Sequence, residues 1–395
     1  MEYQIGGHPI KNICIIGAGN EGHYLMALLG SDCDLKVSVL TSNADNFSDV
    51  ISCHNVQSGH VVEGKLAKVS SSAEEVIPES DMIISTVPSN GCESYLRKIY
   101  PWVKNGCVIC FLPGTGGVEF LTKEFITEKH CIVVGSQRVP SGTKVTKRGA
   151  SVDSLDKRKD LRIATLPKKH CADACEFFTK TLDIKTVALP NYIAVTFTPS
   201  NPILHTSRLY GLFHDYVEGR RYDSHLSFYK NWDDLSSEIL LGCDGELKQC
   251  MDKLPMFDFS GIQLLRYHYE IAEVEGNTDV EKMTRKIRSL IYLKDYAPMK
   301  QTEDGHYLPD FGSRYFVEDF PFGLAILKGY CKLCGIETPY MDKILGWYDG
   351  LFSAGLYVEE KFVGKGVKGL PVPQNYGINT LSELVAYYDK IENGN

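Results

Sequence analysis

Four residues in the second half of the sequence have the types and spacing needed for acid–base chemistry on a carboxylate substrate. Asn201 lies four residues before His205, and a second polar segment carries Arg314 and Asp319. A carboxylate fixes the tautomer of a histidine and makes it a better base near neutral pH. A guanidinium binds a carboxylate through two parallel hydrogen bonds. The set suits hydride transfer at a carbon beside a carboxylate; the structural alternatives are a core histidine and a helix cap with a surface ion pair.

A glycine pattern near the start of the chain has the spacing of a phosphate-binding turn. Gly17-x-Gly19-x-x-Gly22 follows an apolar run at residues 12–16 and opens a helix-like segment at residues 21–29. The first glycine permits a tight turn, the second lets the backbone approach a pyrophosphate, and the third lets helix and strand pack closely. The N–H groups at the start of the helix then face the phosphates. The pattern therefore predicts a dinucleotide-binding β-α-β unit.

Three further loops follow apolar runs, and in a parallel sheet such loops lie at the ligand-binding edge. One begins at Thr41, another contains Val87 and Pro88, and a third contains Thr115. The first loop has no acid before Asp45 and no neighbouring arginine, so the choice between NAD(H) and NADP(H) stays open. The predicted cofactor-binding residues are Gly17, Gly19, Asn20, Gly22, Thr41, Val87 and Pro88.

Composition places these motifs in a folded, mildly acidic protein. The chain has 395 residues, of which 43% are hydrophobic and 23% are charged, and its net charge is −8. The length suggests two domains, and the charge argues against nucleic acid or a membrane surface as a partner. No apolar run is long enough for a transmembrane helix, and the N-terminus lacks the features of a signal peptide. We therefore expect a cytoplasmic protein with reduced thiols at its 13 cysteines, and no metal site.

The order of apolar runs predicts an α/β domain followed by a helical one. Short apolar runs alternate with helical patterns in the first half, which favours a mostly parallel, doubly wound sheet with helices on both faces. Residues 143–148 and 161–166 alternate in polarity and are expected to form an antiparallel hairpin or a pair of strands at the edge of the sheet. Long amphipathic stretches follow, among them residues 202–217 and 316–334. The predicted domains are residues 1–190 and 191–395.

Several motifs together resemble the octopine/nopaline (opine) dehydrogenase family. They are the N-terminal GAGNEGH, LPGTGGVEF at 112–120, NPILH at 201–205, PDFGSRYFVEDFPFGL at 309–324 and PQNYGINTL at 373–381. The block Arg-Tyr-x-x-Glu-Asp-x-Pro is the most specific of them, and the likeness extends over nearly the whole chain.

The resemblance implies a Rossmann domain followed by an all-helical domain like the C-terminal domain of 6-phosphogluconate dehydrogenase, with the active site in the cleft between them. It implies an oxidoreductase acting on CH–NH donors. An amino acid condenses with a 2-oxo acid, such as pyruvate, and NADH or NADPH reduces the imine. By position, His205 matches the catalytic acid–base and Asp319 the carboxylate that orients it. Arg314 matches the group that holds the oxo-acid carboxylate or the cofactor pyrophosphate, and Asn201 a partner at the substrate.

One loop departs from octopine-type members, in which an acidic residue faces the guanidinium of the substrate arginine. Here the corresponding loop carries Gln137 and Arg138. We therefore hypothesise a neutral or acidic amino acid as the substrate, with Arg138 meeting a side-chain carboxylate. The predicted substrate-binding residues are Asn201, Arg314, Thr115, Gln137 and Arg138.

Two other functions stay open, as does assembly into a homodimer. A ketopantoate or 2-hydroxyacid-type reductase has the same two-domain plan, although such enzymes usually depend on a lysine and none lies near Asn201 or His205. A dinucleotide-binding sensor without catalysis is the second alternative. The presence of His205, Arg314 and Asp319 together argues against a sensor.

Overall fold

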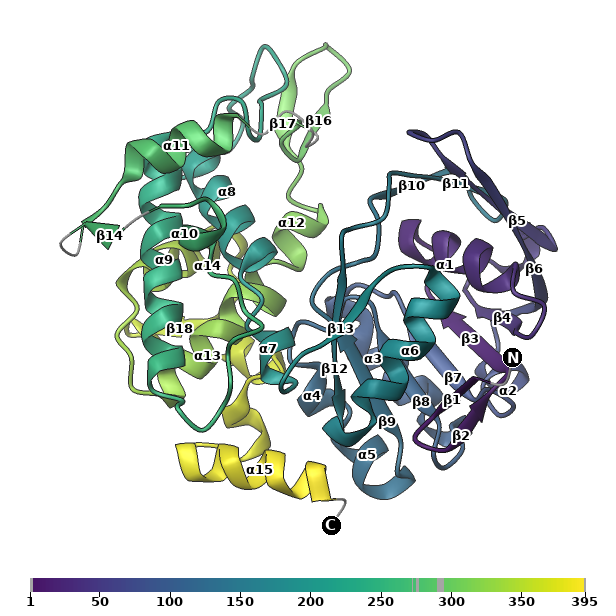
Figure 1. Cartoon of the computed structure of the whole chain (residues 1–395). Helices are drawn as coiled ribbons and strands as arrows, with labels where there is room; N and C mark the ends of the chain where they lie inside the picture. Colours follow the sequence, from purple (N-terminus) through teal and green to yellow (C-terminus); the bar gives the residue numbers. More distant parts are fainter. Residues whose placement is uncertain (1–2, 272, 275–276, 290–294, 394–395) are drawn as a thin grey trace. The chain divides into compact units, whose positions relative to one another are not determined.

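The computed structural model describes residues 3–271, 273–274, 277–289 and 295–393, and it divides into two compact units (Figure 1). The first unit comprises Met1–Thr196 together with Val385–Asn395, and the second comprises Phe197–Leu384. Among the described residues, no helix combines the length and the apolar character that crossing a membrane requires.

A large twisted sheet forms the centre of the first unit. Its six central strands run parallel, in the spatial order β6 (Val61–Ser70), β4 (Lys36–Leu40), β3 (Asn12–Ile16), β7 (Met82–Ser85), β8 (Val108–Phe111) and β9 (Ile132–Ser136). Renumbered along the chain, this is the order 3-2-1-4-5-6 of the dinucleotide-binding doubly wound fold. Because all six strands share one direction, the loops that follow them meet at one edge. The predicted fold class is confirmed for this unit.

The apolar runs become the buried strands for a simple reason. Strands β3, β7, β8 and β9 are buried on both faces, so each needs apolar side chains at successive positions rather than at alternate ones. Helices α1 (Asn20–Gly30) and α6 (Cys171–Leu182) pack on one face, where Ile15, Leu25 and Phe177 share one apolar core. Further helices of the unit are α3 (Ser89–Ile99), α4 (Val118–Leu121) and α5 (Lys123–Lys129).

Both edges of the sheet are extended by strands that depart from the parallel arrangement. Beyond β6 lie β5 (Val50–Asn55), β11 (Ser151–Ser154) and β10 (Thr143–Lys147), and beyond β9 lie β12 (Leu161–Leu166) and β13 (Thr186–Ala188). The predicted pairing of residues 143–148 with 161–166 is wrong: β10 pairs antiparallel with β11, and β12 pairs antiparallel with β9. The chain already reverses at Gly149, whose φ is +73°. The mainly apolar β12 is thereby left to extend the buried side of the sheet.

Shorter elements complete the first unit. They are β1 (Tyr3–Ile5), β2 (His8–Ile10), α2 (Ala73–Val76), α7 (Ile193–Thr196) and the 3-10 turns Ala44–Asn46, Tyr100–Trp102 and Lys168–His170. Most of helix α15 (Leu381–Asn393) is also grouped with this unit. It is held at the buried Glu119, whose backbone carbonyl accepts a hydrogen bond of 2.7 Å from the Tyr387 hydroxyl.

The second unit is mainly helical, with α9 (Asp234–Asp252) as its longest helix. Helices α8 (Thr206–Phe213), α11 (Val280–Arg288), α13 (Ala325–Leu333) and α14 (Pro339–Phe352) pack against it. Two short helices, α10 (Leu265–His268) and α12 (Arg314–Val317), and the 3-10 turns Lys365–Gly369 and Pro373–Tyr376 are also part of this unit. Among the described residues, six short strands form three antiparallel pairs: β14 (Glu273–Val274) with β15 (Asn277–Thr278), β16 (Met299–Gln301) with β17 (Tyr307–Pro309), and β18 (Tyr357–Val358) with β19 (Lys361–Phe362).

Two predicted helices of this unit are each interrupted by a wider turn. The segment predicted at 202–217 begins as a π-helical turn, Ser200–His205, before α8, and the segment at 316–334 contains a second one, Phe320–Leu324, before α13. Each turn contains a proline, Pro202 or Pro321. Proline has no N–H and its ring clashes with the carbonyl four residues earlier, so regular α-helical hydrogen bonding cannot continue there.

Candidate active site

His205 and Asp319 lie side by side in the helical unit. The Nδ1 atom of His205 is 2.8 Å from Oδ2 of Asp319, and the two side chains are only 15% and 13% exposed. An ionised carboxylate has no hydrogen to donate, so this contact requires the proton on Nδ1. The Nε2 atom is then left as the proton donor or acceptor for a reacting group.

The two π-helical turns explain how residues so distant in sequence meet. His205 ends the first turn, Asp319 immediately precedes the second, and the two turns pack against each other. A Cβ atom at Gly323 would lie 3.1 Å from Cγ of Pro202, which is tighter than ordinary contact. Glycine at this position therefore permits the approach of the turns that brings His205 to Asp319. Such π-helical turns occur frequently at functional sites.

Aromatic rings enclose the histidine. The ring centre of His205 is 4.7 Å from that of Tyr315 and 5.6 Å from that of Phe228. Burial, followed by the charge of Asp319, raises the pKa of the Tyr315 hydroxyl, which keeps it neutral. The aromatic side chains beside the imidazole are thus uncharged, and the low exposure of His205 and Asp319 strengthens the interaction between them.

The wall that carries Phe228 is anchored by a buried arginine. Arg208 is 1% exposed, donates to the Phe228 carbonyl at 2.6 Å and pairs with Asp233 at 2.7 Å. It lies one helical turn after His205, so a single helix positions both the histidine and its aromatic neighbour. Arg208 was not among the predicted site residues; its only signal in the sequence was a single charge within an otherwise uncharged helix.

Arg314 lies beside this site without contacting the His205–Asp319 pair directly. Its Nε atom donates to Oε2 of Glu318 at 2.6 Å, and its side chain is 65% exposed. Glu318 therefore holds one edge of the guanidinium. The Nη1 atom has no hydrogen-bond partner among the described residues, so the other edge can receive a carboxylate. Glu318 was not among the predicted site residues.

Asn201 is exposed at the start of the same π-helical turn as His205. This turn begins after Pro199, and no side chain caps it. The structure therefore leaves the Asn201 amide at the surface near the histidine.

In the first unit, the glycine pattern forms a tight turn between β3 and α1. Gly17 has a φ of +102°, and a Cβ atom at Gly22 would lie 2.0 Å from the Gly17 carbonyl oxygen. The space around Gly19 is open, with no atom within 4 Å of the position of a Cβ. No side chain caps the N-terminus of α1. The turn fits the pyrophosphate of a dinucleotide, because it presents uncapped backbone N–H groups at an open surface.

A buried histidine braces this turn. His23 is fully buried, and its Nδ1 atom lies 2.9 Å from the Gly19 carbonyl oxygen. Its Nε2 atom accepts a hydrogen bond of 2.7 Å from the Gly149 backbone N–H. This acceptor role fixes the proton on Nδ1, so the neutral ring ties the glycine turn to the β10–β11 hairpin.

The neighbouring loops supply the remaining predicted cofactor residues. Thr86 donates its hydroxyl to the Gly17 carbonyl at 3.0 Å, and the half-buried Val87 and Pro88 follow it. Thr41, after β4, is buried. Asn20 is the exception, because its side chain accepts a hydrogen bond of 2.8 Å from the Val145 N–H of the hairpin. We therefore assign the Asn20 side chain to bracing the turn.

The predicted substrate loops follow β8 and β9 at the same edge of the sheet. The Gly114 N–H donates to the Ser136 carbonyl at 2.8 Å, and half-buried Thr115 follows. The Gln137 side chain donates to the Ala194 carbonyl at 2.8 Å. Arg138 is half-buried, and its carbonyl accepts a hydrogen bond from the Ser136 hydroxyl.

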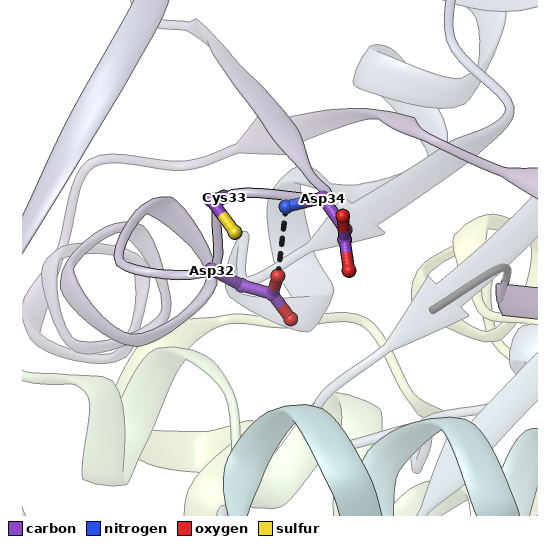
Figure 2. Close-up of side chains that lie close together, drawn as sticks. All are labelled: Asp32, Cys33 and Asp34. Carbon is purple, nitrogen blue, oxygen red and sulfur yellow. Dashed lines mark hydrogen bonds between the residues drawn. The ribbon is translucent and has the colours of Figure 1, made fainter.

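The described residues contain one cluster with the spacing of metal ligands, and its contacts are those of a turn. Figure 2 shows Asp32, Cys33 and Asp34 directly after α1. The Asp34 N–H donates to Asp32 at 2.9 Å, and the Tyr3 hydroxyl donates to the same carboxylate at 2.5 Å. Both Cys33 and Asp34 are exposed. These contacts account for the arrangement without an ion.

Comparisons with known proteins place this geometry in context. Residues 188–352 match the family described as NAD/NADP octopine/nopaline dehydrogenase, alpha-helical domain. The chain is 28% identical to an opine dehydrogenase of Haliotis discus hannai, over 94% of this chain and 98% of that protein. It is 27% identical to a tauropine dehydrogenase of Arabella iricolor, over 94% and 99% of the two chains.

A solved structure of octopine dehydrogenase with NADH and L-arginine has the same fold, with a TM-score of 0.82 at 23% identity over 95% of this chain and 97% of that one. The expected combination of a Rossmann-type sheet and a helical domain is confirmed. His205 and Asp319 both lie within the matched residues 188–352. The resemblance to the octopine/nopaline (opine) dehydrogenase family is thus confirmed, through the alpha-helical domain of that family and through relatives that align along 94% of the chain.

Proposed function

We propose that this protein is an NAD(P)H-dependent opine dehydrogenase, which joins an amino acid to a 2-oxo acid by reductive condensation. The observation that carries the proposal is the 2.8 Å contact between His205 and Asp319 inside the region that matches the family's helical domain. A dyad of this kind provides a proton donor and acceptor near neutral pH. The open glycine turn of the first unit supports the binding of a dinucleotide.

The reaction begins with attack of the amino-acid nitrogen on the carbonyl carbon of the oxo acid, which forms a carbinolamine. Loss of water gives an imine, and addition of hydride to carbon and of a proton to nitrogen gives a secondary amine. The reduced nicotinamide supplies the hydride when it is bound. We assign the proton transfers at the carbonyl oxygen to Nε2 of His205.

The neighbouring residues orient the histidine and the substrate. Asp319 acts as a positioning residue, because its carboxylate holds the proton on Nδ1 and stabilises the imidazolium that forms when Nε2 takes a proton. The open edge of Arg314 is proposed to bind the oxo-acid carboxylate, with Glu318 fixing the guanidinium plane. The exposed amide of Asn201 is proposed to contact the substrate.

The amino substrate is proposed to be neutral or acidic, and the oxo acid to be pyruvate. Gln137 occupies the position where octopine-type enzymes carry an acid, and Arg138 follows it. An arginine substrate would place its guanidinium near Arg138, and like charges repel. Thr115 is proposed to complete this side of the site. Arginine is therefore expected to be a poor amino donor; if it were the best donor in a substrate screen, this assignment would fail.

The two domains are proposed to have different roles. Residues 1–190 are proposed to bind the cofactor, and residues 191–395 to carry the catalytic groups. We expect the enzyme in the cytoplasm, because a reducing compartment keeps its 13 cysteines as thiols. Assembly as a homodimer is compatible with the proposal.

A matrix of oxo acids against amino acids, with NADH and with NADPH, tests the function directly. Oxidation of the reduced cofactor is followed by its absorbance. The proposal predicts turnover only when an oxo acid and an amino acid are both present. Turnover with the oxo acid alone would identify a hydroxyacid-type reductase, and cofactor binding without any turnover would identify a sensor.

A further inference from the structure

The end of strand β4, where this fold usually carries the residue that distinguishes NAD from NADP, has neither an acid nor an arginine. After β4 the chain continues Thr41-Ser42-Asn43, and its first acid, Asp45, is exposed in the 3-10 turn Ala44–Asn46. In this fold an acid at the end of the second strand binds the ribose 2′-hydroxyl of NAD, and a nearby arginine binds the 2′-phosphate of NADP. The selecting group must therefore come from elsewhere in the chain.

The β10–β11 hairpin reaches this place from more than a hundred residues along the sequence. Its Val145 N–H donates to the side chain of Asn20, the first residue of α1, at 2.8 Å. Its Gly149 N–H donates to Nε2 of His23 at 2.7 Å. The hairpin is thus held against the start of the helix that presents its N–H groups to the pyrophosphate.

The tip of the hairpin also contacts the loop that follows β4. The Gly149 carbonyl accepts a hydrogen bond of 2.8 Å from the Ser48 N–H. A Cβ atom at Gly149 would lie 2.1 Å from the Asn46 carbonyl oxygen, and the φ of Gly149 is +73°. Both the positive φ and the close approach require glycine at position 149, and these contacts hold the hairpin tip against residues 46–48.

Arg148 directly precedes this fixed glycine. Its side chain is exposed, and it has no hydrogen-bond or ion-pair partner in the part of the chain that the structure describes. Its charge reaches the imidazole of His23: burial and then the positive charge of Arg148 lower the pKa of that ring. A guanidinium without a partner among the described residues is therefore carried by the hairpin tip that contacts both His23 of the glycine turn and the loop after β4.

We propose that Arg148 binds the 2′-phosphate of NADP(H), and that this chain uses NADP(H) in preference to NAD(H). The proposal rests on the proposed function, since it names the cofactor of that same site. A guanidinium matches a phosphate with two parallel hydrogen bonds, whereas the 2′-hydroxyl of NAD offers it a much weaker partner. Because Arg148 is not engaged by a carboxylate, no ion pair has to be broken when the phosphate binds.

Direct binding measurements test the proposal without requiring turnover. Dissociation constants of NADPH and NADH are measured by calorimetry for the wild-type chain, for Arg148→Ala and for Lys36→Ala. Lys36 is an exposed cation at the opposite end of β4, so its loss controls for a general change in charge. The wild type is expected to bind NADPH at least about tenfold more tightly than NADH.

The Arg148→Ala variant is expected to lose about tenfold to a hundredfold in NADPH affinity, while its NADH affinity and its melting temperature stay nearly unchanged. The Lys36→Ala variant should behave as the wild type. An equal loss of affinity for both cofactors would place Arg148 at the shared pyrophosphate and overturn the proposal. So would a wild-type chain that binds NADH as tightly as NADPH, an outcome that leaves the proposed function standing.

Binding of two cofactor fragments, 2′,5′-ADP and 5′-ADP, isolates the contribution of the 2′-phosphate, because the fragments differ only in that group. The wild type is expected to bind 2′,5′-ADP more tightly than 5′-ADP, and the Arg148→Ala variant is expected to bind the two alike. Equal binding of both fragments by the wild type would contradict the role of Arg148. If neither dinucleotide binds at all, the proposed function fails together with this inference.

Discussion

The Nδ1 atom of His205 lies 2.8 Å from Oδ2 of Asp319, across 114 residues of sequence. Both side chains are largely buried, and two π-helical turns that pack against each other bring them together. The contact is local to the helical unit, so the acid–base pair is assembled by that unit alone.

Replacing His205 with alanine should abolish most of the activity. Without a proton donor and acceptor at the carbonyl, kcat is expected to fall by about 10²- to 10⁴-fold, with cofactor affinity almost unchanged. Steady-state kinetics and cofactor titration measure the two effects. His214, exposed at the end of the same helix, provides the matched control as His214→Ala. Full activity of His205→Ala would refute the acid–base role.

Replacing Asp319 with asparagine should lower the rate. The amide keeps the size of the side chain, but its NH2 group would donate to Nδ1 of His205, so that the ring proton moves to Nε2 and the proton acceptor is lost. The value of kcat is expected to fall about 10²-fold or more, with the KM for the oxo acid changed much less. A fall in kcat accompanied by an equally large rise in KM would indicate a purely structural role for Asp319.

Replacing Arg314 with alanine should weaken binding of the oxo acid. Loss of the two charge-assisted hydrogen bonds is expected to raise the KM for the oxo acid about tenfold to a hundredfold, with a smaller effect on kcat. Glu318→Gln, which loosens the guanidinium without removing it, should give a smaller increase. An unchanged KM in Arg314→Ala would remove this residue from the site.

Glu21 should make the stability of the protein depend on pH. Burial in the first turn of α1 raises the pKa of this carboxyl from 4.5 to about 8. The folded state therefore holds a proton that the unfolded state has lost, and the free energy of unfolding should decrease as pH rises from about 4.5 to about 8. Because the protonated Glu21 carboxyl is neutral, it does not repel the phosphates of a dinucleotide bound at the start of α1.

Chemical denaturation across this pH range, with Glu21→Gln as the variant, measures the effect. In the variant, the free energy of unfolding should no longer decrease between pH 4.5 and pH 8. Its dissociation constant for the cofactor should be the same below and above pH 8. Glu74→Gln, which removes an exposed carboxylate, is the control. A wild-type stability that rises with pH through this window, or a Glu21→Gln profile identical to that of the wild type, would contradict the raised pKa.

The sequence predicts the parts of this structure that depend on local pattern. The apolar run before Gly17 has to become a buried parallel strand, and the glycine spacing predicts the turn between strand and helix. The sequence does not predict the partner of residues 143–147, because the polarity pattern of this strand is compatible with pairing to residues 151–154 or to residues 161–166. Only the reversal at Gly149 decides it.

The candidate site residues could be predicted from their types, but the residues that position them could not. His205, Arg314 and Asp319 are recognisable because a histidine, a guanidinium and a carboxylate are chemically distinctive. Arg208, which anchors Phe228 beside the histidine, and Glu318, which holds Arg314, were assigned their roles only from their contacts. The π-helical turns also escape a search for a period of 3.6 residues, since they are interruptions of that period.

Formation of a carbon–nitrogen bond between two organic substrates distinguishes the proposed opine dehydrogenase from a reductase that acts on the oxo acid alone. The most direct test is mass spectrometry of the product from pyruvate, a nitrogen-15-labelled amino acid and the reduced cofactor. We expect one product that contains both carbon skeletons joined through the labelled nitrogen, and much less of it with His205→Ala. A 2-hydroxy acid formed beside unchanged labelled amino acid would show instead that the oxo acid alone is reduced.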